Sequence, residues 1–446
     1  MRGYQSALSA LAAGFILVQC QMLGGFDDFV VGESVSTSTG DGTTTTGGVG
    51  GTGGGACVLE KPPSRPVIAP PGGVGGIDEA SGAGGISGAG GVGGTGADQT
   101  ITLAVRRVDF GERPNTILKG LDLDDDFTCS DTAQCIDNPR CGRPSAANPV
   151  SWEEARCDGP GGSDSNSRRL FGLISMIEPT FTSAKVSANI GLGEGTLLYV
   201  IEGYNGEADD ESVFLEVYTT SRFVDSCCNR SPEGPNGGKA CPDAEGYPGG
   251  EPSVGRRVPK WDGHDVWPVA RDSVTNNPMP FCNGLTNVQP VDFDGAAYVA
   301  NHELVARLKR VRLFQIIGDD AAELEITDAT VVAPLRQRPD GSWVTEGGLL
   351  AGRLEVSRLF ESVAKLKGVK TGCDFDVVSS SARQQVCDAA DLIGQDRRDT
   401  SSAPCDSVSF ASRFDAEPAL IGDVVRLPEV TSCDVVANFD CGAARR

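Results

Sequence analysis

Two acidic stretches carry residue types and spacing suited to binding a calcium ion. The first reads Asp-Leu-Asp-Asp-Asp at 122–126, and the second reads Cys-Asp-Gly-Pro-Gly-Gly-Ser-Asp-Ser-Asn at 157–166. Calcium takes about six to eight oxygen ligands, which alternating acids in a glycine-containing loop can supply. The candidate ligands are Asp122, Asp124, Asp126, Asp158, Asp164 and Asn166. The complete EF-hand pattern is absent, so the alternative is two solvated loops that nearby cysteines hold in place.

Another stretch combines aromatic, acidic and histidine side chains. It reads Trp-Asp-Gly-His-Asp-Val-Trp at 261–267. Tryptophan faces pack well on the apolar faces of sugar rings, which makes this stretch a candidate carbohydrate contact. The candidate residues are Trp261, Asp262, His264, Asp265 and Trp267. The alternative is that both tryptophans belong to the hydrophobic core and its rim.

No pattern in the sequence identifies a catalytic residue. The only histidines are His264 and His302, and Ala306 stands where a zinc-protease helix would need its second histidine. No Gly-x-Ser-x-Gly elbow accompanies them. A glycosidase would need paired carboxylates, and nothing singles out one pair among 61 acidic residues. We therefore assign no catalytic residue.

Residues 1–20 predict an export signal that ends in a lipidated cysteine. Arg2 precedes an apolar stretch at 7–18, which is too short to span a bilayer comfortably. The following Leu-Val-Gln-Cys resembles a bacterial lipobox, with Gln19 in place of the usual small residue. Cys20 would then carry the lipid anchor. By analogy with lipoprotein sorting, the absence of aspartate immediately after it favours the outer membrane.

Cysteine number and net charge indicate the compartment and exclude some partners. The chain has 15 cysteines without a Cys-x-x-Cys pair, which favours disulfides in an oxidising compartment over a zinc framework. Setting aside Cys20 leaves an even number that can pair fully. The formal net charge of −23 argues against nucleic acid and anionic membrane surfaces as partners. The lipid anchor is then the only expected contact with a membrane.

Residues 21–98 have the composition of a disordered spacer. Glycine makes up 25 of these 78 residues, and Gly-Gly-Val-Gly-Gly occurs at 47–51 and again at 72–76. Such a chain buries too little apolar surface to offset its ordering entropy. Random-coil scaling gives a stalk of this length a root-mean-square reach of about 45–55 Å.

Beyond residue 98, short runs of alternating apolar and polar residues predict strands. Expected strands include 182–190, 197–201, 213–218, 303–308, 311–317 and 324–333, and Pro-Asp-Gly at 339–341 predicts a hairpin turn. We therefore predict a mainly β fold, with an antiparallel β-sandwich or jelly roll over 99–349. Apolar residues at helical spacing from Val356 to Leu366 predict that 350–446 is a small helical, disulfide-linked appendage packed on the sandwich. A second small domain is the alternative.

Several short stretches, taken in order, are similar to a family of uncharacterised exported lipoproteins of myxobacteria. They are Gly-Leu-Asp-Leu-Asp at 120–124, Cys-Asp-Gly-Pro-Gly-Gly at 157–162, Glu-Gly-Tyr-Asn-Gly at 202–206, the stretch 261–267, Ala-Tyr-Val at 297–299, Leu-Ala-Gly-Arg at 350–353 and Cys-Asp-Ser-Val-Ser at 405–409. The resemblance covers most of 105–420. It implies location and architecture only, and it implies no catalytic residues.

The sequence thus predicts a cell-envelope lipoprotein that acts as a surface or periplasmic binding module, or as a structural one. A carbohydrate or an envelope protein is the expected ligand, because acidic and tryptophan residues lie in predicted loops. The alternative is a secreted hydrolase of envelope or prey polymers. Calcium is the only cofactor that the sequence suggests.

Overall fold

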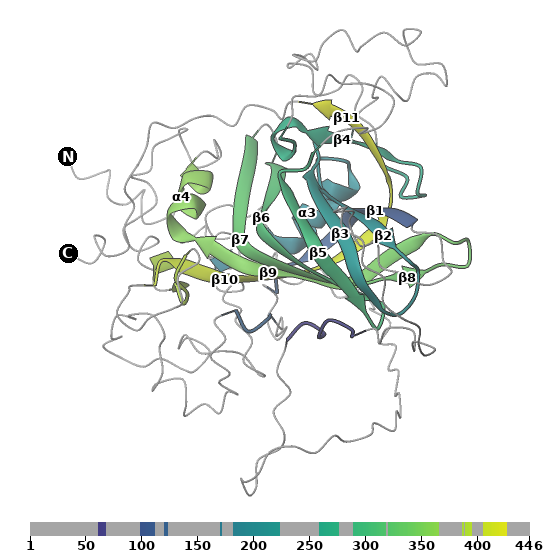
Figure 1. Ribbon diagram of the computed structural model, residues 1–446. Coiled ribbons are helices and arrows are strands. Elements are labelled where there is room, and N and C mark those ends of the chain that lie inside the picture. Colours follow the sequence, from purple (N-terminus) through teal and green to yellow (C-terminus); the bar gives the residue numbers. More distant parts are fainter. Residues whose placement is uncertain are drawn as a thin grey trace, which may run out of the picture. The chain divides into compact units, whose positions relative to one another are not determined.

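A computed structural model describes residues 61–67, 99–111, 120–123, 170–171, 182–223, 258–275, 289–317, 320–364, 386–387, 389–394 and 405–425. The chain divides into two compact units, Met1–Gly55 and Ala56–Arg446, and every described residue lies in the second. This unit is mainly β, as predicted (Figure 1).

Eight antiparallel strands close into a barrel. They are β1 (Gln99–Asp109), β2 (Leu197–Tyr204), β3 (Asp210–Thr219), β5 (Asp292–Ala300), β6 (Glu303–Ile317), β7 (Asp320–Pro334), β9 (Trp343–Glu355) and β10 (Ser407–Pro418). The sheet order is β10-β1-β2-β3-β5-β6-β7-β9-β8, and β10 also pairs with β9, which closes the wall. The short β8 (Arg336–Gln337) pairs with β9 alone. Successive barrel strands are therefore neighbours, and β1 and β10 complete the circle.

The closed barrel corrects the predicted sandwich or jelly roll. Strands of either architecture alternate between a buried and a more exposed face, as β1 does where Ile101, Leu103 and Val105 are buried. What distinguishes the barrel is the pairing of its outermost strands, in which Leu103 lies opposite Pro418. Local patterning carries no information about a pairing so distant in the sequence.

Residues after 350 do not form the predicted helical appendage in the part of the chain that the structure describes. β9 continues to Glu355, and α4 (Val356–Ala364) follows where a helix was expected. The next described strand, β10, is part of the barrel wall. β11 (Leu420–Val425) then pairs in parallel with β4 (Val266–Ala270).

The predicted strand at 182–190 is the helix α3 (Ser183–Gly191). Thr182 caps its N-terminus, because the threonine side chain accepts a hydrogen bond from the Lys185 amide. Buried Ser183, Val186 and Ile190 lie on one helical face, so the helical period and not the apparent alternation decides the local structure. Among the described residues, no helix is long and apolar enough to cross a membrane.

Side chains fill the barrel. The larger of two hydrophobic clusters contains the inward residues of all eight wall strands, together with residues of α3 and α4. Stacked rings of Phe110 and Phe171, with centroids 4.2 Å apart, pack on Phe410 of β10. An interior cavity lined by residues such as Tyr199 and Phe414 measures about 20 Å³. That is room for about one or two water molecules, against several hundred Å³ for a typical ligand pocket.

A second hydrophobic layer covers part of the outer wall. β4 and β11 place Trp267, Val269 and Val424 in one cluster with Leu198 of β2 and Tyr218 of β3. The outer surface of β2 and β3 is therefore divided into a covered part and an open part. The open part carries the candidate site.

Connections at the two ends of the barrel differ greatly in length. Short turns join β2 to β3, β5 to β6 and β7 to β9 at one end. The other end has the connections at 110–196, 220–291 and 356–406, besides the two-residue link from β6 to β7. Eleven of the 15 cysteines fall in these three long connections. Among them, Cys387 and Cys405 are buried and disulfide-bonded, and the other cysteines lie outside the described residues.

Candidate functional site

Only one predicted calcium ligand is described. The side chain of Asp122 is fully buried, and its carboxylate lies 3.7 Å from the Lys61 ammonium group. The other five, Asp124, Asp126, Asp158, Asp164 and Asn166, lie outside the described residues, as does Cys20. The described part of the chain contains no group of three or more potential metal-ligating side chains. Asp122 therefore takes part in a buried ion pair, and the calcium site stays a prediction.

The tryptophan stretch forms a tight turn on the barrel. The buried Asp265 carboxylate accepts hydrogen bonds from the amides of Lys260 and Trp261, at 3.1 and 2.6 Å. These bonds hold Trp261 at a positive φ of 59°. His264 is 87% exposed, and its amide donates to Asp262. Aspartate side chains that accept nearby amides are a common way to stabilise such turns.

The two tryptophans of this stretch lie in the packed layer. Trp267 has no exposed surface, and its ring centroid lies 4.9 Å from that of Phe223 and 5.5 Å from that of Trp261. Trp261 is half-buried beneath the Arg106 guanidinium, 5.7 Å from the ring centroid. Asp262 and His264 are thus the residues of this stretch that solvent reaches most freely.

His302 belongs to the turn between β5 and β6. It has a φ of 62°, and the preceding Asn301 has a φ of 53°, as a two-residue hairpin turn requires. Its Nδ1 lies 3.3 Å from the hydroxyl of Tyr204. Burial, helped by the charges of Asp210 and Glu207, raises the pKa of Tyr204 to about 12. These contacts connect neighbouring hairpins at the short-turn end of the barrel.

A site that sequence reasoning missed lies on the open outer wall of β2, β3 and β5. Glu202 lies opposite Phe214, and Glu216 lies opposite Phe293, in the registers of the two strand pairs. The rings of Phe214 and Phe293 stack at 20°, with centroids 5.4 Å apart, and Phe293 is 50% exposed. We call these four residues the Phe–Glu face.

Gly295 makes room for the ring that supports this face. A Cβ atom at Gly295 would lie 3.3 Å from a ring carbon of Phe214. The glycine lies where the register between β3 and β5 shifts, between the pairs Val213–Ala297 and Leu215–Asp294. The local irregularity of β5 thus lets Phe214 lie flat beneath Phe293.

The carboxyl group of Glu216 has an unusual environment. Tyr218 donates a hydrogen bond of 2.7 Å to it. Burial raises the pKa of Glu216, the Tyr218 hydrogen bond opposes that rise, and the charge of Glu202 adds to it. Glu202 itself is exposed. Two carboxyl groups in different environments therefore flank one pair of aromatic rings.

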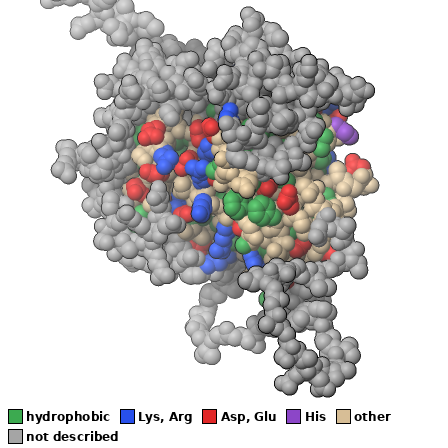
Figure 2. Space-filling model, turned by 45° about the horizontal axis from the view of Figure 1, so that its top comes forward, with side chains coloured by type: hydrophobic (Ala, Val, Ile, Leu, Met, Phe, Trp, Pro, Cys, Tyr) green, Lys and Arg blue, Asp and Glu red, His purple; other side chains and the backbone are tan. Residues whose placement is uncertain are grey.

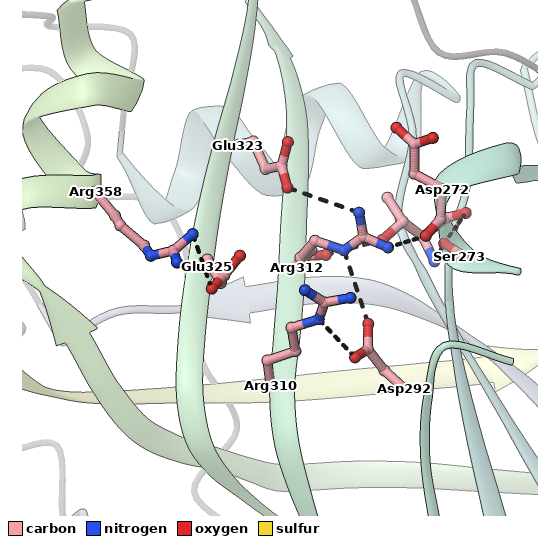
Figure 3. Close-up of polar contacts among 9 residues, drawn as sticks. Asp272, Ser273, Asp292, Arg310, Arg312, Glu323, Glu325 and Arg358 are labelled. Carbon is pink, nitrogen blue, oxygen red and sulfur yellow. Dashed lines mark hydrogen bonds and ion pairs between the residues drawn. The ribbon is translucent and has the colours of Figure 1, made fainter. Parts of the chain in front are cut away.

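An ion-pair network lies at the start of β5, directly before Phe293 in the chain (Figure 3). Asp292, directly before Phe293, lies 3.0 Å from Arg310 and 3.7 Å from Arg312. Arg312 also lies 4.0 Å from Glu323 and donates to the Asp272 carbonyl. The buried Asp292 is thereby paired with two cations, which offsets the cost of removing its charge from water.

The network also ties the start of β5 to the neighbouring elements. Thr219, at the end of β3, donates a hydrogen bond from its hydroxyl group to the Arg312 carbonyl. Its amide donates to the Ser273 hydroxyl, which follows β4. Arg358 of α4 pairs with Glu325 of β7 at 3.2 Å on the far side of the network. Phe293 therefore lies in a part of β5 whose preceding residue is held by ion pairs to β6.

One face of the molecule gathers these three kinds of side chain together. Figure 2 shows a hydrophobic cluster near the centre of the face, with acidic groups beside it and basic and acidic groups mixed together to its left. Aromatic rings accept the apolar face of a flat or ring-shaped ligand, and charged groups at the edge bind its hydroxyl or amide groups. The arrangement suits recognition of a sugar ring.

No protein-family model, curated protein or solved structure matches the chain.

Proposed function

We propose that the protein is an exported, lipid-anchored binding module that recognises carbohydrate through the Phe–Glu face. The observation that carries this proposal is the ring of Phe293, which is 50% exposed, stacked on Phe214 and paired across the strands with Glu216. Exposed aromatic rings with polar neighbours are typical of binding surfaces. A sugar offers one apolar face to the rings and hydroxyl groups to both carboxylates.

The location of the module is proposed from the sequence. Cys20 would carry the anchor in the outer membrane, and the part of 21–98 that precedes Lys61 would provide a spacer between the anchor and the barrel unit. The barrel then supplies a rigid wall on which the face is held. The disulfides proposed for the long connections suit an exported protein.

A glycan array followed by calorimetry tests the proposal. The full chain should bind at least one bacterial, fungal or plant polysaccharide, and Phe293→Ala should weaken binding by roughly tenfold, the effect of losing about 1.5 kcal/mol of ring contact. Leu420→Ala is the matched control, because Leu420 is 47% exposed and lies on β11, outside the face. Absence of any glycan binding, or equal loss in both variants, would refute the proposal.

Glu216 supports a second candidate function, a hydrolase of envelope or prey polysaccharides. A glycosidase needs one protonated and one ionised carboxyl group. Burial raises the pKa of Glu216, which favours its protonated form, and Glu202 provides a second carboxyl group on the same face. If the array identifies a polysaccharide, release of reducing ends should then fall by at least about a hundredfold in both Glu216→Gln and Glu202→Gln. Binding without release of reducing ends would leave the module as a binding protein only.

A further inference from the structure

The segment 61–67, Lys-Pro-Pro-Ser-Arg-Pro-Val, lies against the barrel although it precedes β1 by more than 30 residues. It forms neither helix nor strand. Pro62, Pro63 and Pro66 are half-buried, whereas the other four residues are exposed. Proline fixes its own φ and keeps the preceding residue extended, so this segment is stiff before it docks.

Three contacts join the segment to β5. The Tyr298 hydroxyl donates to the Pro63 carbonyl at 2.5 Å. The Arg65 guanidinium lies 5.1 Å from the centre of the Tyr298 ring and donates to the Ala296 carbonyl. A tyrosine that holds a proline-rich backbone while stacking on an arginine combines a hydrogen bond with a cation–π contact.

The Ala296 carbonyl is accessible because β5 and β6 pair over only a short length. Their ladder joins Tyr298, Val299 and Ala300 to the first residues of β6, and Ala296 lies before it. The Ala296 carbonyl and the Tyr298 ring therefore lie side by side on β5, and the Arg65 guanidinium contacts both of them.

Lys61 anchors the other end of the segment. Its ammonium group lies 3.7 Å from the Asp122 carboxylate, whose side chain is fully buried, while the lysine side chain is 34% exposed. Two cations four residues apart thus contact two separate places on the barrel unit.

We propose that Ala296, Tyr298 and Asp122 form a binding site for a proline-rich basic peptide, and that residues 61–67 of the same chain occupy it. Proline-rich segments lose little conformational entropy on binding, and aromatic side chains commonly recognise them. Because the segment belongs to the same chain, its effective concentration at the site is high, and a free peptide must compete with it. This inference is independent of the Phe–Glu face.

Fluorescence anisotropy of a labelled peptide with the sequence of 61–67 tests the proposal on the full chain. In Lys61→Ser/Arg65→Ser the segment should leave the site, so the peptide should bind this variant at least tenfold more tightly than it binds the wild type. Lys185→Ser/Arg336→Ser is the matched control, because it removes two cations, from α3 and β8, that do not contact the site. This control should bind the peptide as weakly as the wild type.

Variants of the site complete the test. Adding Tyr298→Phe to Lys61→Ser/Arg65→Ser removes the hydroxyl donor but keeps the ring, and should weaken peptide binding by roughly threefold to tenfold. A peptide with serine in place of both cations should not bind. Equal binding to wild type and Lys61→Ser/Arg65→Ser, or no binding to that variant up to millimolar peptide, would overturn the proposal. Thermal melts of each variant establish that the barrel remains folded.

Discussion

The protonation of Glu216 should make the stability of the folded protein depend on pH. Burial raises the pKa of Glu216, so the folded protein holds this proton at a pH where the unfolded chain has lost it. Its contribution to stability is therefore full below the unfolded pKa, about 4.3, and is lost as the pH rises through the folded pKa. In thermal melts from pH 3.5 to 7, Glu216→Gln should gain melting temperature relative to wild type as the pH rises.

Asp340 supplies a control of opposite sign. Hydrogen bonds from the Ser342 side chain and amide lower the pKa of Asp340, so its contribution is present above the unfolded pKa and is lost as the pH falls. Asp340→Asn should therefore lose melting temperature relative to wild type as the pH rises. Parallel behaviour of the two variants would contradict the assigned environment of Glu216.

Single residues of the Phe–Glu face could be predicted only in part. Alternation along 213–218 places Phe214 and Glu216 on the face opposite Val213 and Leu215, as the structure has them. That Glu216 lies opposite Phe293 depends on a register between strands separated by a long connection. The aromatic signal at 261–267 was conspicuous in the sequence, yet burial of Trp267 depends on β4 packing against β2 and β3.

The barrel wall depends on close approach of β9 to β7. A Cβ atom at Gly352 would lie 2.5 Å from the Ile326 side chain and 2.8 Å from the Thr327 carbonyl. Gly352→Ala should therefore overpack the wall and lower the free energy of unfolding by about 1–3 kcal/mol in denaturant melts. Gly191→Ala is the control, because no atom lies within 4 Å of its added Cβ, and a helical alanine is as stable as glycine or more so. An unchanged melt of Gly352→Ala would mean that the strands can separate without cost.

Elements with strong local signals were predicted well. The expected strands at 303–308, 311–317 and 324–333 lie within β6 and β7. The turn after Pro339 forms as predicted, with Gly341 at a φ of 86°. α3 was missed because the alternation in its short sequence competed with a helical period, and only its cap and its packing decide between them.

At the scale of the whole molecule, the two ends of the barrel differ because all three long connections leave the same end. Short turns close one end. The other has the three long connections that carry 11 of the 15 cysteines, besides the two-residue link from β6 to β7. A sequence shows the lengths of these connections as soon as the strands are assigned. It does not show that they share an end, because that follows from the alternating direction of eight strands and from the closure of β10 on β1.

Reduction should therefore loosen the molecule from one end. Cys387 and Cys405 are buried and disulfide-bonded in the connection between β9 and β10, and loss of one native disulfide costs about 2–5 kcal/mol. With reductant present, hydrogen exchange measured by mass spectrometry should rise in α4 and around Cys387 and Cys405. The hairpins β2–β3 and β5–β6 should keep their protection at the short-turn end, because backbone ladders and Asn301–His302 close them without cysteine. A uniform rise across all strands would mean that the disulfides hold the whole barrel together, and no rise at all would mean that the core is stable without them.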